Sequence, residues 1–319
     1  MNRRQTIPKE LRYTIDQFND QFPNDEACFQ TIAERRYPGG MAECEKCGTL
    51  RKHHRVTGRT AYACDRCGNH IFPLAGTIFE KTTTKLRLWF YAIYLMSSTR
   101  CGISAKQIQR ETGVTYKTAW RMFKQIRSLL AENIQLEGSS IEVDEMYYGG
   151  KRKGGTGRPM RGDKVKTPVL GMVERKGRVI AKTIPDTTAA TLVGTVHEFV
   201  LPKSTVFTDE LNAYNTLPGK RQYNHQRINH SSKVYVVGDV HTNTIEGFWS
   251  LVKLGIGGVY HSVSQKYLQN YLDEYSYRYN RRDTGNLIFH DVLAKAVQPL
   301  AVKPDPKAVK MTPEISVPF

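Results

Sequence analysis

Two C-x-x-C pairs limit the fold of this chain more than any other feature of its sequence. Sixteen residues separate the pairs, which consist of Cys44, Cys47, Cys64 and Cys67. Four thiolates in this arrangement are the ligand set of a closed tetrahedral zinc site. Residues 55–63 lie between the pairs and have the pattern of a hairpin that turns at Gly58. We therefore predict a zinc ribbon that holds a structural Zn²⁺ ion.

Other uses of the cysteines fit less well. A redox dithiol needs a single C-x-x-C pair, and disulfides are typical of exported chains. Residues 1–22 lack the apolar stretch of a secretory signal, and no run of eighteen apolar residues predicts a membrane span. We therefore expect a protein of the reducing cytoplasm with no membrane partner. Because four cysteines fill the tetrahedron, we expect the nearby histidines to lie at the surface or to face phosphate; they are His53, His54 and His70.

The net charge of +17 comes from 47 Lys and Arg against 30 Asp and Glu. Such an excess predicts a polyanionic partner, although a merely soluble basic protein is the alternative. The excess is high in residues 81–135, which contain ten Lys or Arg and two acidic residues. Basic residues of the ribbon also favour DNA as the polyanion, and these are Arg51, Lys52, Arg55 and Arg59.

Residues 104–126 have the pattern of a helix-turn-helix. Ser104 can cap a first helix, Gly113 can make the turn, and Thr115 can cap a second helix. The second helix has apolar residues at helical spacing, namely Ala119, Met122, Phe123 and Ile126. Its exposed face would present to DNA the side chains of Tyr116, Lys117, Arg121 and Lys124. An ordinary helix pair with a solvated basic face would have the same pattern.

The pattern becomes rich in strands after Ser139. Alternation places Ile141 and Val143 on one face of the first strand, with Glu142 and Asp144 on the other. Two strands, a helix, a short strand and a helix follow at 167–173, 178–184, 189–200, 204–208 and from residue 242. This order is that of an RNase H-like fold, in which an antiparallel hairpin joins parallel strands in a mixed sheet.

Three carboxylates occupy positions where α/β folds build their sites. Asp144 lies on the first strand, Asp209 follows the later strand, and Glu246 lies one turn into the last helix. Hard oxygen ligands bind Mg²⁺ or Mn²⁺, and two such ions can stabilise both the attacking and the leaving oxygen at a phosphodiester. Lys253 follows Glu246 by seven residues, nearly two helical turns, so it would face the same way and hold a phosphate.

Other acidic residues compete for these positions. Glu142 and Glu145 are alternative ligands on the first strand, and Asp239 and Asp273 are alternatives elsewhere. Each acid taken singly could also be an ordinary exposed charge that binds no metal.

Several stretches closely resemble bacterial insertion-sequence transposases of the zinc-ribbon DDE family. The most specific is His-Thr-Asn-Thr-Ile-Glu-Gly-Phe-Trp-Ser-Leu-Val-Lys at 241–253. The others lie at 143–150, 208–209, 258–262 and 277–280, and the ribbon belongs to the same pattern. The resemblance extends over roughly residues 20–285. It implies an RNase H-like core, two divalent metal ions, and cutting and joining of transposon ends.

The resemblance maps the first two acids onto Asp144 and Asp209, and it carries Lys253 over directly. The third position is open between Glu246 and Asn243, since some relatives have Asn there. We favour Glu246 as the metal ligand, with Asn243 beside it on the same helical face. Residues 151–166 hold seven Lys or Arg and four Gly. We expect this loop to order on DNA through Lys151, Arg152, Lys153, Arg158 and Arg161, whereas a disordered solvated loop is the alternative. We also expect phosphate contacts from Arg278, Arg281 and Arg282.

These patterns predict an α+β or α/β multidomain chain in four parts. They are a helical lead-in and zinc ribbon at 1–80, a helix-turn-helix region at 81–136, a DDE catalytic domain at 137–285 and a tail at 286–319. As a transposase, the chain would bind the terminal inverted repeats, hydrolyse a phosphodiester and join the free 3′-OH to target DNA. It would act on nucleoid DNA as a homo-oligomer. A nuclease or resolvase without strand transfer, or a DNA-binding regulator without catalysis, remains an alternative.

Overall fold

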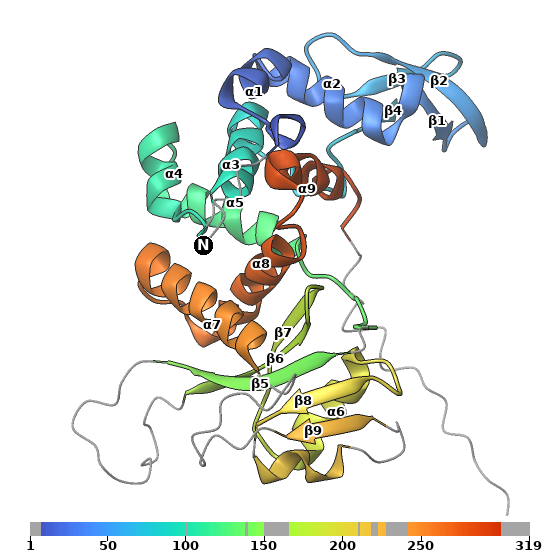
Figure 1. Cartoon of the computed structure of the whole chain (residues 1–319). Coiled ribbons are helices and arrows are strands. Elements are labelled where there is room, and N and C mark those ends of the chain that lie inside the picture. The colour runs from blue at the N-terminus through green and yellow to red at the C-terminus, as the bar shows by residue number, and fades with distance from the viewer. Residues whose placement is uncertain are drawn as a thin grey trace, which may run out of the picture. The chain divides into compact units, whose positions relative to one another are not determined.

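A computed structural model describes residues 8–99, 101–137, 140–149, 166–209, 211–217, 223–227 and 242–300. The chain divides into two compact units (Figure 1). The first unit consists of Met1–Pro23 and Arg87–Leu293, and the second of Asn24–Leu86 and Ala294–Phe319. The helix-turn-helix region and the predicted catalytic region therefore lie in one unit. The four-part division by sequence stays a prediction.

The second unit contains the cysteine pairs. Its helix α2 spans Asp25–Arg36 and begins at Asn24, whose side chain accepts a hydrogen bond from the backbone of Ala27. A four-stranded antiparallel sheet follows, in the order β1 (Met41–Cys44), β2 (Thr49–Arg55), β3 (Tyr62–Cys64) and β4 (His70–Ile71). The helix packs on this sheet through Phe29, which stacks on Tyr62 at 6.0 Å between ring centroids. The strands place the two cysteine turns at one end of the ribbon.

The helix-turn-helix pattern predicts the observed helices and turn. Helix α4 (Ala105–Thr112) follows an N-cap at Ser104, and helix α5 (Tyr116–Ser128) follows an N-cap at Thr115. The hydroxyl oxygen of each cap accepts a hydrogen bond from the backbone N–H group three residues later. Gly113 joins them with φ of +71°, a conformation that glycine adopts at little cost. The four apolar residues predicted for the inner face of α5 are fully buried. Helices α1 (Ile15–Gln21) and α3 (Leu86–Ser98) complete this part of the first unit.

A five-stranded mixed sheet organises the rest of the first unit. Its order is β7-β6-β5-β8-β9. The antiparallel strands are β5 (Ile141–Tyr148), β6 (Thr167–Glu174) and β7 (Val179–Thr183), and the strands parallel to β5 are β8 (Thr205–Thr208) and β9 (Asn224–Arg227). The predicted RNase H-like mixed sheet is therefore confirmed, and β9 is an addition to the sequence prediction.

Helices cover both faces of this sheet. Ile141 and Val143 of β5 face a core that includes residues of α6 (Ala189–Phe199). Met146 of β5 faces a second core with α7 (Asn243–Gly255) and α8 (Leu268–Asn280). Alternation along β5 thus sends even-numbered side chains toward α7 and odd-numbered ones toward α6.

The predicted tail contains a helix. Helix α9 spans Ile288–Ala296, and Phe289 is fully buried with its ring stacked 4.9 Å from that of Tyr13. Apolar residues at helical spacing, which include Val292 and Leu293, explain why this stretch packs. The prediction of a tail from residue 286 is thus corrected for 288–296, and residues 301–319 lie outside the described part. Among described residues, no helix is both long and apolar enough to cross a membrane.

Candidate functional site

Three carboxylates converge where β5 and β8 run side by side. Asp144, Glu145 and Asp209 each have an oxygen within 4.8 Å of the others. The parallel register pairs Glu142 with Phe207, so two residues further along both strands Asp144 comes level with Asp209. The carboxyl ends of neighbouring parallel strands meet at one edge of the sheet, which brings these distant residues together. The site thus combines Asp144 and Asp209 as predicted, with Glu145 alongside them instead of replacing Asp144.

Burial and the repulsion of nearby negative charges make Asp144 and Glu145 resist ionisation. Burial raises the pKa of Asp144 to about 6, and the nearby charges of Asp209 and Glu246 also raise it. The pKa of Glu145 is raised to about 7 by burial and by the charge of Asp209. A hydrogen bond from Trp249 to Asp144 and one from Tyr214 to Glu145, each 2.9 Å long, act in the opposite direction. Half-buried carboxylates whose pKa values are raised by burial and by one another's charge are a donor set that a divalent cation fits.

Glu246 lies next to this cluster, on the first turn of α7. Its carboxylate accepts a 3.2 Å hydrogen bond from Thr242 Oγ1, and its side chain is exposed. Its charge acts on Asp144, although it is not among the three oxygens that lie within 4.8 Å of one another. Asn243 and Lys253 are also exposed on α7. The choice between Glu246 and Asn243 as the third ligand stays open.

Glu142 has a structural place that the sequence did not reveal. Its carboxylate is fully buried and accepts hydrogen bonds from the backbone N–H groups of Thr244 at 2.8 Å and Ile245 at 3.0 Å. It also forms a 2.8 Å ion pair with Arg175. Thr242, the N-cap of α7, makes no side-chain cap hydrogen bond, so Glu142 takes over that function from the adjacent strand. The alternative of Glu142 as a metal ligand is therefore wrong.

Of the two other alternative acids, Asp273 is described and does not belong to the acidic cluster. Asp273 lies on α8 and accepts a 2.8 Å hydrogen bond from Gln269. Asp239 lies outside the described residues.

Gly171 gives Trp249 access to Asp144. It stands opposite Asp144 in the β5–β6 register. A Cβ atom at this position would lie 2.4 Å from the indole of Trp249. The indole passes over the glycine and donates its Nε1 hydrogen to Asp144. Trp249 follows Glu246 by three residues, and this helical spacing was the only sequence signal for its role.

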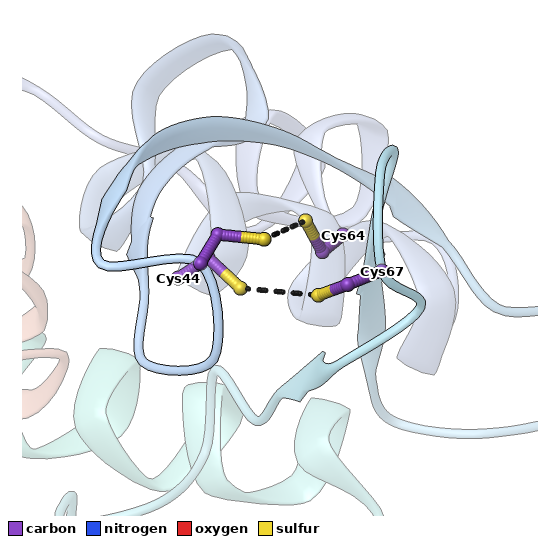
Figure 2. A group of neighbouring side chains, drawn as sticks. Cys44, Cys64 and Cys67 are labelled. Atoms are coloured by element: carbon purple, nitrogen blue, oxygen red, sulfur yellow. Dashed lines mark hydrogen bonds between the residues drawn. The ribbon is translucent and has the colours of Figure 1, made fainter.

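The four cysteines of the ribbon form a second cluster (Figure 2). Their sulfur atoms all lie within 4.8 Å of one another, with Cys44 to Cys67 at 3.5 Å and Cys47 to Cys64 at 4.0 Å. Tetrahedral thiolates at the usual zinc–sulfur bond length would be about 3.8 Å apart, so the arrangement fits such an ion. The glycines that follow the two pairs, Gly48 and Gly68, have φ of +66° and +69° as the turns require.

One histidine near the ribbon differs from its prediction. His53 is 2% exposed, and its Nδ1 lies 3.0 Å from the carbonyl oxygen of Arg51. The expectation that it lies at the surface or faces phosphate is therefore wrong, because position 53 points into the ribbon. His54 is exposed and His70 half-buried, in agreement with the expectation.

The basic residues predicted to contact DNA have different surroundings. On α5, Lys117, Arg121 and Lys124 are exposed. In the ribbon, Arg51 pairs with Asp65 and Arg55 pairs with Glu26, both at 3.0 Å, whereas Lys52 and Arg59 are exposed. Five further predicted contacts lie outside the described residues, namely Lys151, Arg152, Lys153, Arg158 and Arg161. The exposed face of α5 is therefore the best-defined basic surface.

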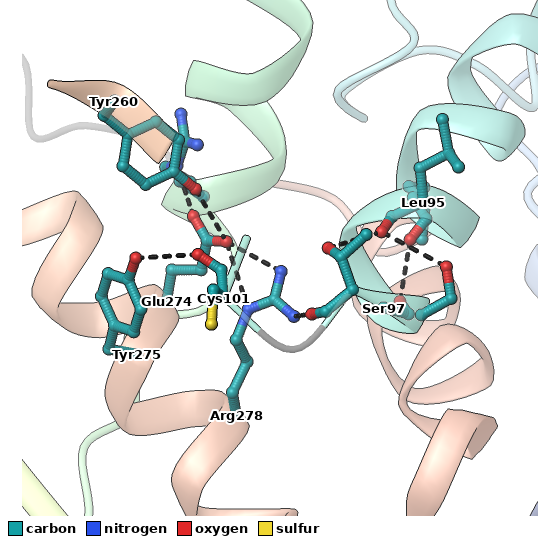
Figure 3. A network of polar contacts seen from close by, with 11 residues as sticks. Leu95, Ser97, Cys101, Tyr260, Glu274, Tyr275 and Arg278 are labelled. Carbon is teal, nitrogen blue, oxygen red and sulfur yellow. Dashed lines mark hydrogen bonds and ion pairs between the residues drawn. The ribbon is translucent and has the colours of Figure 1, made fainter. Parts of the chain in front are cut away.

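Two of the three arginines at the end of α8, Arg278 and Arg281, form ion pairs within the first unit. Arg278 pairs with the fully buried Glu274 at 2.8 Å (Figure 3). Arg281 pairs with Glu132 at 2.7 Å. Arg282 donates to the carbonyl oxygens of Gly177 and Tyr279, both at 2.9 Å. The expectation of phosphate contacts is therefore corrected for Arg278 and Arg281, whose guanidinium groups pair with carboxylates, whereas for the exposed Arg282 it stays a prediction.

Two regions of the chain match known transposase domains. Residues 135–280 match the ISXO2-like transposase domain, and residues 23–70 match the transposase zinc-ribbon domain. The chain is 28% identical over 277 residues to the "Uncharacterized protein in transposable element ISH50" of Halobacterium salinarum, across 81% of this chain and 91% of that protein. It is 29% identical over 113 residues to an "Uncharacterized transposase-like protein" of Haemophilus influenzae, across 35% of this chain and 89% of that protein.

The two matched domains contain the two side-chain clusters of the structure. The cysteine pairs lie within the zinc-ribbon match, and Asp144, Asp209 and Glu246 lie within the transposase match. The chain therefore contains a transposase zinc-ribbon domain and an ISXO2-like transposase domain, and it is similar to proteins of insertion sequences.

Proposed function

We propose that this protein is an enzyme that cuts DNA at the ends of an insertion sequence and joins them to target DNA. The observation that supports this most is the convergence of Asp144, Glu145 and Asp209 at the edge of β5 and β8, in a chain with a DDE transposase domain. These residues come from segments that are more than sixty positions apart in the sequence. If these acids were merely part of a charged surface, there would be no reason for three carboxylates to meet in a partly buried place.

Asp144, Asp209 and Glu246 would hold two divalent ions, Mg²⁺ or Mn²⁺, with Asn243 beside Glu246. When bound, such ions stabilise charge on the attacking and leaving oxygens of a phosphodiester. Trp249 orients Asp144 through its hydrogen bond, and Tyr214 does the same for Glu145. Lys253, nearly two turns after Glu246 on α7, would hold a backbone phosphate beside the acids.

The proposed reaction has two steps. Water attacks the phosphorus at an element end, the P–O3′ bond breaks, and a 3′-OH and a 5′-phosphate result. The 3′-OH then attacks a phosphodiester of target DNA in the same site, so one P–O bond forms as another breaks. Neither step needs a covalent bond between protein and DNA.

The remaining parts of the chain would bring DNA to this site. Four thiolates would hold a structural Zn²⁺ ion in the ribbon. The ribbon and the exposed face of α5, with Lys117, Arg121 and Lys124, would bind the terminal inverted repeats. The basic segment of residues 151–166 would add contacts next to the acids. Pairing two ends calls for a homo-oligomer, which would act on nucleoid DNA in the cytoplasm.

The test is an assay with DNA that carries the ends flanking the gene, a supercoiled target and Mg²⁺. We expect both nicked ends and joined product from the parent protein, and neither from Asp144→Asn or Asp209→Asn. Asp283→Asn makes the same charge change at an exposed position and should retain both activities. Nicks without joined product would favour a nuclease, and unchanged cleavage by the two variants would refute the site.

A further inference from the structure

A cavity of about 900 Å³ lies within the first unit, away from the acidic cluster. Its walls come from α4 and α5 on one side, and from residues 258–264 and α8 on the other. Its volume falls within the range of about 300–1,000 Å³ that is typical of pockets for small ligands. The proposed catalytic site makes no use of this cavity.

Aromatic rings form much of its wall. Tyr116, Trp120, Tyr260, Tyr267 and Tyr271 all line it. The rings of Trp120 and Tyr267 meet edge to face at 5.2 Å, and those of Tyr260 and Tyr271 at 4.7 Å. Tyr116, at the start of α5, keeps 44% of its surface exposed. Aromatic faces of this kind bind nucleobases by stacking, whatever the base.

Cations accompany these rings. The ammonium group of Lys106 lies 4.8 Å from the ring centre of Tyr116. That of Lys124 lies 5.6 Å from Trp120 and 5.5 Å from Tyr267. Rings next to cations suit a ligand that has both a flat base and a phosphate, because the base can stack while the phosphate pairs with the ammonium groups.

A buried guanidinium, that of Arg127, also lines the cavity. Arg127 is 4% exposed, and its Nε donates to Glu274 at 2.6 Å. Its Nη2 is buried and makes no hydrogen bond to any described residue. Figure 3 shows the Glu274 network that fixes this corner. The guanidinium carbon of Arg127 lies 4.1 Å from the ring centre of Tyr271 and 5.1 Å from that of Tyr260, so a positive charge borders this wall of the cavity.

The position of the cavity relates it to bound DNA. Tyr116 and Trp120 lie on the face of α5 toward the cavity, whereas Lys117 and Arg121 are exposed next to them. A strand whose phosphates contact Lys117 and Arg121 therefore passes the mouth of an aromatic cavity. A base that leaves its pair can enter there, and a mismatched or unpaired base does so at the lowest cost.

We propose that this cavity receives one unpaired nucleobase of the bound DNA, stacked on Tyr116 and Trp120 with Arg127 at its edge. The proposal rests on the DNA-binding function proposed above and adds to it a preference for locally opened DNA. Tyr116 and Trp120 are then binding residues that act outside the acidic site.

The test compares binding to the fully paired terminal sequence with binding to a set of duplexes that each have one mismatch. We expect the parent protein to bind at least one mismatched duplex about tenfold more tightly, since stacking of one base has roughly that effect or more. Tyr116→Ala should abolish this preference, whereas Tyr116→Phe should retain it. Lys117→Ala is the matched control, because loss of a phosphate contact should weaken binding to both kinds of duplex equally.

The outcomes separate the two proposals. If the parent binds paired and mismatched DNA equally, or if Tyr116→Ala keeps the preference, the cavity proposal is wrong while DNA binding stands. If the parent binds none of these duplexes, the proposed function itself fails and the cavity proposal fails with it.

Discussion

At the scale of single residues, two aromatic side chains orient the acidic cluster by hydrogen bonds. Trp249 fixes one oxygen of Asp144, and Tyr214 fixes one oxygen of Glu145. Both partners are almost fully buried, so their donors have little freedom to turn away. Fixed donors reduce the motion of metal ligands, which is a common requirement of metal-dependent sites.

The raised pKa values predict how stability depends on pH. The pKa of Asp144 is about 6, above its ordinary value because of burial. Between about pH 4 and pH 6 the folded protein therefore keeps a proton on Asp144 that the unfolded chain has released. The stability that this proton contributes is fully present below about pH 4 and is lost as the pH rises through 6. Its size is about 3 kcal/mol on the scale of roughly 1.4 kcal/mol per pKa unit.

The measurement is urea unfolding at pH 5 and pH 8 in buffer without divalent cations. We expect the free energy of unfolding of Asp144→Asn to fall less between these pH values than that of the parent, because the amide does not ionise. Asp283→Asn should follow the parent. Added Mg²⁺ should stabilise the parent at pH 8 and stabilise Asp144→Asn less. Equal pH dependence of all three proteins would contradict this explanation.

At the scale of elements, α7 depends on a neighbouring strand for its first turn. Glu142 of β5 accepts from two backbone N–H groups at the start of this helix. The same helix contains Glu246, Trp249 and Lys253. The buried carboxylate of Glu142 therefore fixes the start of the helix that positions three residues of the proposed site.

Glu142→Gln should both destabilise the protein and slow DNA cleavage. The amide keeps the shape, but it removes the negative charge that pairs with Arg175 and weakens the helix cap. We expect a loss of about 3 kcal/mol in unfolding free energy, as for breaking a buried ion pair. Thr188→Ala removes the side-chain cap of α6 and is the control, with an expected loss of about 1 kcal/mol and unchanged cleavage per folded molecule. Full cleavage by folded Glu142→Gln would show that the cap does not position α7.

At the scale of the whole molecule, one unit joins the helix-turn-helix to the sheet and the other contains the ribbon. Arg127 of α5 and Glu274 of α8 form a buried ion pair within the first unit. Separating such a pair would leave an uncompensated charge in the interior, which costs several kcal/mol. We therefore expect the helix-turn-helix and the sheet to unfold together.

Metal removal should affect the second unit first. We expect one zinc ion per chain in the purified protein, and a chelator should remove it and unfold the ribbon, because structural zinc supplies folding free energy. Zinc content would be measured by atomic absorption, and hydrogen exchange would compare residues 41–71 with residues 141–183. Cys67→Ser should lose zinc, whereas Cys101→Ser, at an exposed cysteine outside the cluster, should keep it. Equal zinc content in both variants would argue against the four-cysteine site.

Much of the fold could be predicted from local patterns. The spacing of the cysteines, the caps at Ser104 and Thr115 and the alternation of β5 each depend on residues close together in the sequence. The helix α9 was missed because a few apolar residues beyond a turn-rich stretch give a weak signal. The pattern leaves Glu142 open as an alternative ligand, since a buried acid looks the same in sequence whether it caps a helix or holds a metal.

The sequence alone predicted the ribbon, the helix-turn-helix and two acids of the candidate site, because metal-ligand spacing, helix caps and family motifs are local. Only the tertiary structure decided that Glu145 joins Asp144 and Asp209, that Glu142 caps α7 and that Arg278 pairs with the buried Glu274. These outcomes depend on which strands are neighbours and on which side chains are buried together. Such contacts join residues tens of positions apart, and no local pattern records them.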